Sequence, residues 1–462
     1  MTGRRISSVC HVGNIAIGGD NPIRIQSMAT TDTNDTESSV AQAKRIIDAG
    51  GELVRLTTQG RREAENMANI SAALKAEGYT TPLVADVHFN ANVADIAAKY
   101  CEKVRVNPGN YVDPARTFKH IDYSAEEYAD ELQKIEERFI PFLNICKEHH
   151  TAIRIGVNHG SLSDRIMSRY GDTPEGIVES CMEFLRICKR ENFTDVVLSI
   201  KASNTVVMVQ SVRLLVSTMD KEDMHYPLHL GVTEAGEGED GRIKSAVGIG
   251  ALLTEGIGDT IRVSLSEEPE CEIPVAKKIV GFIDECASLR ENASIENDTL
   301  FLSFNEENRE DLQLKAAMAA GALLIDRKAK ELCITNFDKP QQELADAIMQ
   351  AARVKFTKTE YISCPGCGRT LYDLRGTIAK IKAAVAQETA MSDKAEIWKS
   401  LKIGIMGCIV NGPGEMADAD YGYVGAGPNR ISLYKGKQCI EKNIPESEAV
   451  EKLLDYIKND IK

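Results

Sequence analysis

Ala152-Ile153-Arg154-Ile155-Gly156-Val157 and Asp195-Val196-Val197-Leu198-Ser199-Ile200 are two short, mainly apolar runs, and a helix-like pattern occupies 173–190 between them. Apolar runs of this length predict buried β-strands. A strand, a helix and a second buried strand form the repeating unit of a parallel sheet. The stretch 152–200 therefore indicates an α/β domain.

The same unit recurs on both sides of this stretch. Helix-like segments over 38–49, 125–149 and 245–255 alternate with further apolar runs. This alternation predicts a (β/α)8 TIM-type barrel, with a doubly wound open sheet as the alternative. No G-x-G-x-x-G follows the first strand, which disfavours that alternative. The predicted strands are 23–27, 53–57, 83–87, 103–107, 152–157, 195–200, 227–231 and 260–264.

Polar side chains stand at the end of nearly every predicted strand. In a barrel these ends meet at one mouth, where active sites are built. A single strand-end arginine usually extends its charge into solvent, but cations in five separate units predict an anion pocket. Guanidinium groups bind phosphate oxygens bidentately, so we expect a small phosphate ester, and a diphosphate in particular. The cations are Arg55, Arg105, Arg154, Lys201 and Arg262, and His88, Asn107, Asn158, His229 and Ser264 are further polar residues at these ends.

Two carboxylates, Asp86 and Glu234, belong to the same predicted mouth. Carboxylates among cations are commonly ion-pair partners. Hydrogen bonding to substrate hydroxyls or proton transfer is an equally good interpretation. The sequence leaves both roles open.

The composition argues against some classes of partner. Acidic residues outnumber basic ones by 69 to 55, a net charge of −14, and no block of Lys and Arg is present. Nucleic acid is therefore not expected as a partner, because phosphate backbones require a basic footprint. No signal-like or membrane-spanning apolar segment occurs, and the twelve cysteines show no disulfide framework. We expect a protein of the reducing cytoplasm that does not bind membranes.

Two glycine-rich turns near the end of the chain carry cysteines. Ser363-Cys364-Pro365-Gly366-Cys367 is a C-x-x-C turn, and Cys408 and Glu415 lie in a second turn. A thioredoxin-type pair would open a helix after a strand, and structural zinc would need a fourth Cys or His near Cys408. Three cysteines can instead hold a [4Fe–4S] cube, with Glu415 or substrate on the fourth iron. This interpretation predicts a redox enzyme, and the other nine cysteines are interpreted as small buried side chains.

The chain is too long for one ordinary domain. We expect the barrel over 1–270, a partial insert or linker over 271–356, and an α+β iron–sulfur domain over 357–462. Within the middle segment, 299–337 has a strand–helix–strand pattern. Its Gly321-Ala322-Leu323-Leu324 repeats Gly250-Ala251-Leu252-Leu253 of the last barrel helix. We interpret this short α/β segment as a structural spacer.

Seven motifs together resemble one family, the (E)-4-hydroxy-3-methylbut-2-enyl diphosphate synthase family (the IspG/GcpE family). The resemblance covers about residues 5–270 and 357–462. The motifs are VADVHF (84–89), VRVNPGN (104–110), IRIGVN (153–158), SIKAS (199–203), HLGVTEAG (229–236), GIGDTIRVS (256–264) and GCIVNGPGE (407–415).

This resemblance implies reductive ring opening of 2-C-methyl-D-erythritol 2,4-cyclodiphosphate in the methylerythritol phosphate pathway, with two electrons consumed and one water lost. It implies a [4Fe–4S] cluster on Cys364, Cys367 and Cys408, with Glu415 as the displaceable fourth ligand. It also implies a ferredoxin or flavodoxin as electron donor. Asp86, Asn158, Glu234 and Glu415 are the expected catalytic residues, and Arg55, His88, Arg105, Asn107, Arg154, Lys201, His229, Arg262 and Ser264 the expected substrate ligands.

The middle segment departs from both forms of the family. The compact form passes almost directly from barrel to cluster domain, and the plant-like form inserts a whole barrel-like domain. This chain resembles the plant-like form with a shortened insert. In the compact form, the barrel of one subunit meets the cluster domain of the other, so we expect a homodimer.

Three other classes compete with this interpretation. A non-redox hydro-lyase would use an open iron as Lewis acid and would need no electron donor. An iron–sulfur sensor or electron carrier would leave the charged barrel mouth without a role. A zinc-stapled barrel enzyme would be colourless and contain no labile sulfide.

Overall fold

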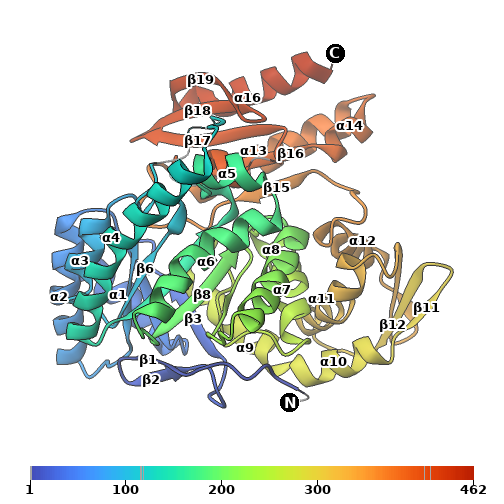
Figure 1. Ribbon diagram of the computed structural model, residues 1–462. Coiled ribbons are helices and arrows are strands. Elements are labelled where there is room, and N and C mark those ends of the chain that lie inside the picture. Colours follow the sequence, from blue (N-terminus) through green and yellow to red (C-terminus); the bar gives the residue numbers. More distant parts are fainter. Residues whose placement is uncertain (1–2, 115–116, 118, 410–411, 417, 462) are drawn as a thin grey trace.

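The computed structural model describes residues 3–114, 117, 119–409, 412–416 and 418–461, so Val410 and Asn411 of the second cysteine turn lie outside the described residues. An eight-stranded parallel sheet surrounded by helices forms its largest part (Figure 1). The strand order is β8-β7-β6-β5-β4-β3-β10-β9, and a parallel bridge between Leu198 and Leu228 links the two outer strands. The predicted (β/α)8 barrel is confirmed.

The barrel strands lie close to their predicted positions. All residues of β4 to β8 are buried, as expected for parallel strands covered on both faces. The last two strands, β9 and β10, are shorter than predicted. Two residues of β9 pair with β10, and the same two residues of β10 also pair with β3. The strands are β3 (Arg24–Met28), β4 (Leu53–Thr58), β5 (Leu83–Val87), β6 (Lys103–Val106), β7 (Ala152–Asn158), β8 (Val196–Lys201), β9 (His229–Leu230) and β10 (Thr260–Ile261).

The helices around the barrel begin at recognisable caps. For α4, the Ser124 hydroxyl accepts a hydrogen bond from the Glu127 N–H, and the Glu127 carboxylate accepts one from the Ser124 N–H. The last barrel helix, α8, begins at Gly238, seven residues before the predicted start at Ser245. The helices are α1 (Thr36–Asp48), α2 (Arg61–Ala76), α3 (Ala91–Ala97), α4 (Ala125–His149), α5 (Asp164–Tyr170), α6 (Pro174–Arg190), α7 (Thr205–Lys221), α8 (Gly238–Leu253) and α9 (Glu272–Gly281), with short 3-10 turns at Pro108–Asn110, His159–Ser161 and Pro269–Cys271.

A short hairpin that the sequence did not predict closes the other end of the barrel. Strands β1 (Cys10–Val12) and β2 (Ile15–Ile17) pair antiparallel. Cys10, Val12 and Ile17 are fully buried, and they form an apolar cluster with the first inward-facing residues of several barrel strands, Leu53, Val84, Ala152 and Val197. The hairpin therefore covers the end of the barrel at which these strands begin.

The middle segment packs against the barrel as a small α/β unit, on the right in Figure 1. Its sheet order is β11-β12-β13-β14, and β12 and β13 are parallel with α11 between them. The predicted strand–helix–strand pattern over 299–337 is confirmed. The elements are α10 (Ile283–Glu291), β11 (Ser294–Glu296), β12 (Thr299–Phe304), α11 (Arg309–Ile325), β13 (Glu331–Asn336), β14 (Lys339–Pro340) and α12 (Gln342–Ala351).

The two repeated Gly-Ala-Leu-Leu sequences lie in helices that pack against each other. A Cβ on Gly250 of α8 would lie 2.9 Å from the Cβ of Met318, and a Cβ on Gly321 of α11 would lie 2.7 Å from the Val247 carbonyl oxygen. Glycine at both positions allows the two helices to approach closely. The repeat therefore builds the contact between barrel and insert, and it explains why α8 is buried almost all round.

The terminal domain is a five-stranded sheet with order β15-β16-β17-β18-β19 and helices packed on it. The α+β composition that the sequence predicted for this part of the chain is confirmed. The elements are β15 (Glu360–Ser363), α13 (Leu374–Met391), α14 (Ala395–Ser400), β16 (Lys402–Met406), α15 (Gly412–Glu415), β17 (Tyr421–Gly427), β18 (Arg430–Lys435), β19 (Gln438–Pro445) and α16 (Glu446–Ile461).

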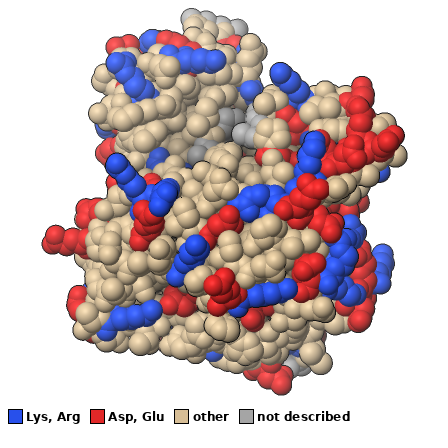
Figure 2. Space-filling model, turned by 60° about the vertical axis from the view of Figure 1, so that its left-hand side comes forward, with Lys and Arg blue, Asp and Glu red and all other residues tan. Residues whose placement is uncertain are grey.

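The terminal domain lies over the end of the barrel opposite the β1–β2 hairpin (Figure 1). On the face drawn in Figure 2, basic and acidic side chains are interspersed rather than gathered by sign. None of the helices in the described part of the chain has the length and apolar character needed to cross a membrane.

Candidate active site at the barrel mouth

A cavity lies between the carboxyl ends of the barrel strands and the cysteine turns of the terminal domain. Its empty volume, which includes space open to solvent, is about 680 Å³. Both domains of the same chain line it. The predicted site residues in its wall are Arg55, Asp86, His88, Arg105, Arg154, Asn158, Lys201, Glu234, Arg262, Ser264, Cys364, Cys367 and Cys408.

Three other predicted site residues lie close to the cavity but not in this wall. The Asn107 side chain donates to the Ser161 hydroxyl (2.8 Å) and accepts from the Gly109 N–H (3.2 Å), so it holds the turn after β6. His229 is fully buried, and neither ring nitrogen has a hydrogen-bond partner among the described residues. Burial and the nearby Lys201 lower the pKa of His229 well below its usual range. Glu415 is buried at the contact between the two domains.

The strands place the cationic side chains inside the barrel because side chains alternate along a strand. Asp86, Arg105 and Arg154 are direct neighbours on β5, β6 and β7. Two glycines leave room for long side chains: a Cβ on Gly156 would lie 2.6 Å from Arg105 Nε, and one on Gly231 would lie 3.0 Å from Lys201 Nζ. The glycines in the IRIGVN and HLGVTEAG motifs are thus explained by packing.

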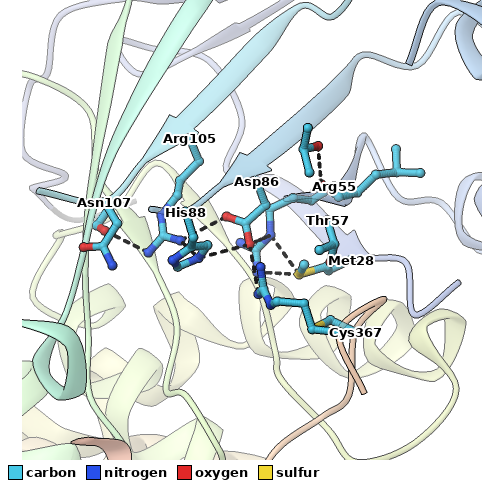
Figure 3. Close-up of polar contacts among 12 residues, drawn as sticks. Met28, Arg55, Thr57, Asp86, His88, Arg105, Asn107 and Cys367 are labelled. Carbon is cyan, nitrogen blue, oxygen red and sulfur yellow. Dashed lines mark hydrogen bonds and ion pairs between the residues drawn. The ribbon is translucent and has the colours of Figure 1, made fainter. Parts of the chain in front are cut away.

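Asp86 is the common partner of the cations in the mouth (Figure 3). Burial alone would raise the pKa of Asp86, but Arg105 and Arg55 outweigh burial and hold that pKa well below its usual range. Asp86 is therefore ionised at all ordinary pH values and balances positive charge. Its carboxylate oxygens lie 3.1 Å from Arg105, 3.7 Å from Arg154, 3.7 Å from His88 and 4.0 Å from Arg55.

The cations of the mouth outnumber the carboxylates that pair with them. Arg262 is paired with Glu272 at 2.9 Å and 3.0 Å. Arg55 Nη1, Arg105 Nε and both Nε and Nη1 of Arg154 are buried without a hydrogen-bond partner among the described residues. Burial and neighbouring arginines lower the pKa of Lys201 well below its usual range. These unpaired donors suit a ligand with several anionic oxygens.

His88 contributes no charge to this surplus. Burial and the adjacent Arg105 lower the pKa of His88 to about 3. The ring is therefore neutral near pH 7. Its Nε2 atom faces Arg105 and Asp86. It can bind a ligand as a hydrogen-bonding group but not as a cation.

Two buried carboxyl groups, Glu234 of the barrel and Glu415 of the terminal domain, interact electrostatically across the domain boundary. Burial raises the pKa of Glu234, and burial together with Glu234 raises the pKa of Glu415 well above its usual range. In each, Oε2 has no hydrogen-bond partner among the described residues. Glu234 also has a backbone φ of 49°, in the left-handed region. The pair can therefore hold a proton inside the cavity.

Three of the four cysteines of the terminal domain, Cys364, Cys367 and Cys408, line this cavity, and none of them is in a disulfide. The Gly366 N–H donates to the Cys364 sulfur (3.3 Å), and Gly366 has a φ of 83°, which this tight turn requires. Among the described residues, no three His, Cys, Asp or Glu side chains converge on one point as ligands of a single metal ion would. A cube takes each thiolate on a separate iron, so its ligands need not converge. Three thiolates at separate points of the cavity wall are a donor set that an iron–sulfur cube can use.

Arg369 also lines the cavity, and sequence reasoning missed it. It follows the C-x-x-C turn directly and is the one cation in the segments 363–373 and 406–416. Its Nη2 lies 3.7 Å from Asp86 Oδ2. A charged residue in an otherwise uncharged glycine-rich turn was the signal that could have identified it.

Close backbone contacts hold the cysteine turns on the barrel. A Cβ on Gly414 would lie 1.6 Å from the Gly160 carbonyl oxygen, and the Gly160 N–H donates to Glu415 Oε1 (3.3 Å). The Ser203 hydroxyl donates to the Glu415 carbonyl oxygen (3.0 Å), and the Ser266 hydroxyl to that of Cys364 (3.0 Å). One chain thus brings the cations and the thiols to the same cavity.

Comparisons with known proteins cover the same two parts of the chain. Residues 7–277 match the sequence model of the GcpE TIM-barrel domain, and residues 360–459 match that of the GcpE protein C-terminal domain.

Three relatives carry the name 4-hydroxy-3-methylbut-2-en-1-yl diphosphate synthase (flavodoxin). The protein from Bacteroides thetaiotaomicron is 50% identical, and the match covers 99% of this chain and 98% of the relative. Those from Akkermansia muciniphila and Protochlamydia amoebophila are 40% and 35% identical, covering 98% and 99% of this chain and 96% of each relative. The first alignment spans 612 positions against 462 residues here, so the relative has a longer chain. On these matches to both domains and over nearly its whole length, the chain belongs to the GcpE family.

Proposed function

We propose that this chain catalyses the reductive ring opening of 2-C-methyl-D-erythritol 2,4-cyclodiphosphate to (E)-4-hydroxy-3-methylbut-2-enyl diphosphate. The name carried by its relatives denotes the synthase of that product. The observation that carries the proposal is the single cavity in which buried cations of the barrel and three cysteines of the terminal domain meet. The chain is accordingly an iron–sulfur oxidoreductase of isoprenoid biosynthesis.

The work is divided along the chain. Residues 1–270 bind the diphosphate, 357–462 carry the cluster, and 271–356 act as the shortened insert. The packing of α11 on α8 supports this division, because it fixes the insert to the barrel and away from the cavity.

Cys364, Cys367 and Cys408 would hold a [4Fe–4S] cluster, with Glu415 as its displaceable fourth ligand. When bound, the cluster supplies electrons and a Lewis-acidic iron for the oxygen that leaves. The Glu415 Oε2, which has no hydrogen-bond partner among the described residues, and the buried position of Glu415 against Gly160 of the barrel support this assignment.

The barrel cations bind and orient the substrate. Arg55, Arg105, Arg154, Lys201 and Arg262 surround the two phosphates. The unpaired nitrogens of Arg55, Arg105 and Arg154 supply hydrogen-bond donors. Ser264 and the neutral His88 add polar contacts from the same wall, while Asn107 and His229 support that wall from behind. Fixing the diphosphate at several points holds the ring in one orientation.

Loss of the oxygen as water requires a proton. Asp86 cannot supply one, since its neighbours keep it ionised. Glu234 lines the cavity, and burial raises its pKa, so a proton held at its free Oε2 is available to the leaving oxygen. Asn158, in the same wall, orients the substrate through its amide. Asp86 then serves as the counter-ion that keeps the cations in place.

The electron donor is a flavodoxin, as the name of the relatives states for them, or a ferredoxin. The homodimer expected from the compact form stays a prediction. Since both halves of the cavity come from one chain, activity does not depend on that dimer.

The test is to incubate anaerobically reconstituted protein with the cyclodiphosphate and reduced viologen and to follow phosphorus species by NMR. We expect the linear allylic diphosphate to appear only when the donor is present. Conversion without a donor would instead identify a hydro-lyase, and a cluster-loaded protein that left the substrate intact would refute the proposed activity.

Two cysteine variants of the terminal domain sharpen this test. Cys408→Ser should lose the visible absorption of the cluster, its labile sulfide and all turnover. Cys439→Ser is the matched control, because Cys439 is half-buried in the same domain but does not line the cavity. Equal loss in both variants would argue against the assigned ligands.

A further inference from the structure

Arg369 reaches from the terminal domain into the mouth of the barrel. Its side chain is only 8% exposed, and its Nη2 lies 3.7 Å from Asp86 Oδ2 on β5. It lines the cavity together with the barrel cations and the three thiols. The other cations of this cavity wall, such as Arg154 and Lys201, come from the barrel.

The guanidinium of Arg369 has donors to spare. Nε and Nη1 are buried and have no hydrogen-bond partner among the described residues. Leaving a buried donor unpaired is unfavourable, and more so for a charged group. Two such donors on one side chain, inside a cavity, indicate a ligand that the side chain is placed to bind.

Asp86 cannot satisfy Arg369 alone. The same carboxylate is shared with Arg55, Arg105 and Arg154, at 4.0, 3.1 and 3.7 Å. Arg369 therefore adds positive charge to a site that already has a surplus. An anion is the ligand that removes this surplus, and the fork of the guanidinium suits phosphate oxygens.

Resting on the function proposed above, we propose that Arg369 is a diphosphate ligand supplied by the terminal domain. The anion then bridges the barrel cations and Arg369, so that substrate binding holds the terminal domain closed over the mouth. Substrate binding and assembly of the site are one event. Arg369 thus acts as a binding residue that also positions the cysteine turns.

Arg375 provides a matched control in the same domain. It also crosses to the barrel, where it pairs with the Glu268 carboxylate and donates to the Glu267 carbonyl oxygen at 2.7 Å. These partners lie outside the cavity, and both side chains of the pair are partly exposed, at 38% and 48%. Arg375→Gln removes a cation between the domains without removing one from the cavity.

The experiment measures the affinity of the cluster-loaded protein for inorganic pyrophosphate by calorimetry and domain closure by hydrogen exchange at the Gly160–Gly414 contact. Arg369→Gln should weaken pyrophosphate binding about tenfold or more, as loss of a charged hydrogen bond predicts. It should also abolish the protection that pyrophosphate induces at this contact and raise the KM of the cyclodiphosphate. Arg375→Gln should keep the wild-type affinity.

Arg369→Lys keeps the charge but loses the fork, so it should bind pyrophosphate with intermediate affinity. Wild-type affinity for pyrophosphate in Arg369→Gln would overturn the inference. If Arg369→Gln fails to load its cluster, the Arg369→Lys variant decides, and wild-type affinity in that variant would overturn the inference. A shifted reduction potential with unchanged pyrophosphate affinity would also overturn it, since Arg369 would then act on the cluster alone. Pyrophosphate binding is independent of turnover, so failure of the proposed reaction in the wild type would leave this test intact.

Discussion

Lys103 lies on the inward face of β6, two residues before Arg105, and its side chain is fully buried. Nζ has no hydrogen-bond partner among the described residues. Burial lowers the pKa of Lys103 to about 7; Cys10 opposes this shift, and Arg154 and Arg55 add to it. Lys103 thus lies between the apolar cluster of the β1–β2 hairpin and the cations of the mouth. Its buried position lowers the stability of the fold.

Replacing Lys103 by methionine should stabilise the protein. The side chains are similar in length, and the change removes a buried charge, so we expect the free energy of unfolding at pH 6 to rise by roughly 2 kcal/mol. Thermal unfolding measured from pH 6 to pH 10 checks this. Lys75→Met, at a partly exposed surface pair with Glu102, should have little effect.

The pH dependence has a definite sign. In the unfolded chain a lysine titrates near pH 10.4, whereas Lys103 titrates near 7 when folded. Between these values the unfolded chain binds more protons, so wild-type stability falls as pH drops towards 7 and then levels off. The advantage of Lys103→Met should be largest below pH 7 and should shrink towards pH 10. An advantage independent of pH would contradict this account.

At the residue scale, the sequence predicted the cations of the mouth well, because a polar residue at the end of a buried parallel strand has few other places to point. It did not predict that Asn107 would cap a turn or that His229 would be fully buried without a hydrogen-bond partner among the described residues. Both depend on one position of register along a strand. Arg369 was missed because its partner, Asp86, is distant in sequence.

At the scale of elements, the contact between the turn at His159–Ser161 and α15 positions Glu415. Gly160 and Gly414 meet backbone to backbone, and neither has room for a side chain. A methyl group on either glycine would force the terminal domain away from the mouth. The geometry of the site therefore depends on two glycines that carry no chemistry.

Gly414→Ala should leave the cluster in place and impair catalysis. Displacing a reacting group by about 1 Å can cost on the order of 100-fold in rate, so we expect a loss of this size in kcat/KM with an unchanged visible spectrum. Gly427→Ala is the control, since its new Cβ would lie 3.8 Å from the Arg430 Cβ, an ordinary contact. Wild-type kcat/KM in Gly414→Ala would show that the contact is not needed.

Most elements were predictable because their signals are local. Buried parallel strands are continuous apolar runs, and capping residues in the sequence mark where helices begin. The β1–β2 hairpin was missed because its strands have three residues each and are stable only against the barrel. The early start of α8 was missed because a helix buried on nearly every side shows no amphipathic period.

At the scale of the whole molecule, one chain contains both halves of the cavity. The insert fixes α11 on α8, and from there α12 leads into the terminal domain above the mouth. The sequence predicted both halves but not their meeting within one chain, because domain placement depends on long-range contacts such as Gly160 with Gly414. In the compact form that motivated the expected homodimer, these halves come from different subunits.

The central claim is that a single chain assembles the redox site from its own barrel and its own cysteine turns. The most direct test mixes two inactive variants, Lys201→Met and Cys408→Ser, by co-expression with different tags and assays the purified mixture for donor-dependent formation of the allylic diphosphate. The account predicts no recovery of activity, because the site of each chain contains one inactivating substitution. Recovered activity in the mixture would contradict it, since a site could then be built from the barrel of one chain and the cysteines of another.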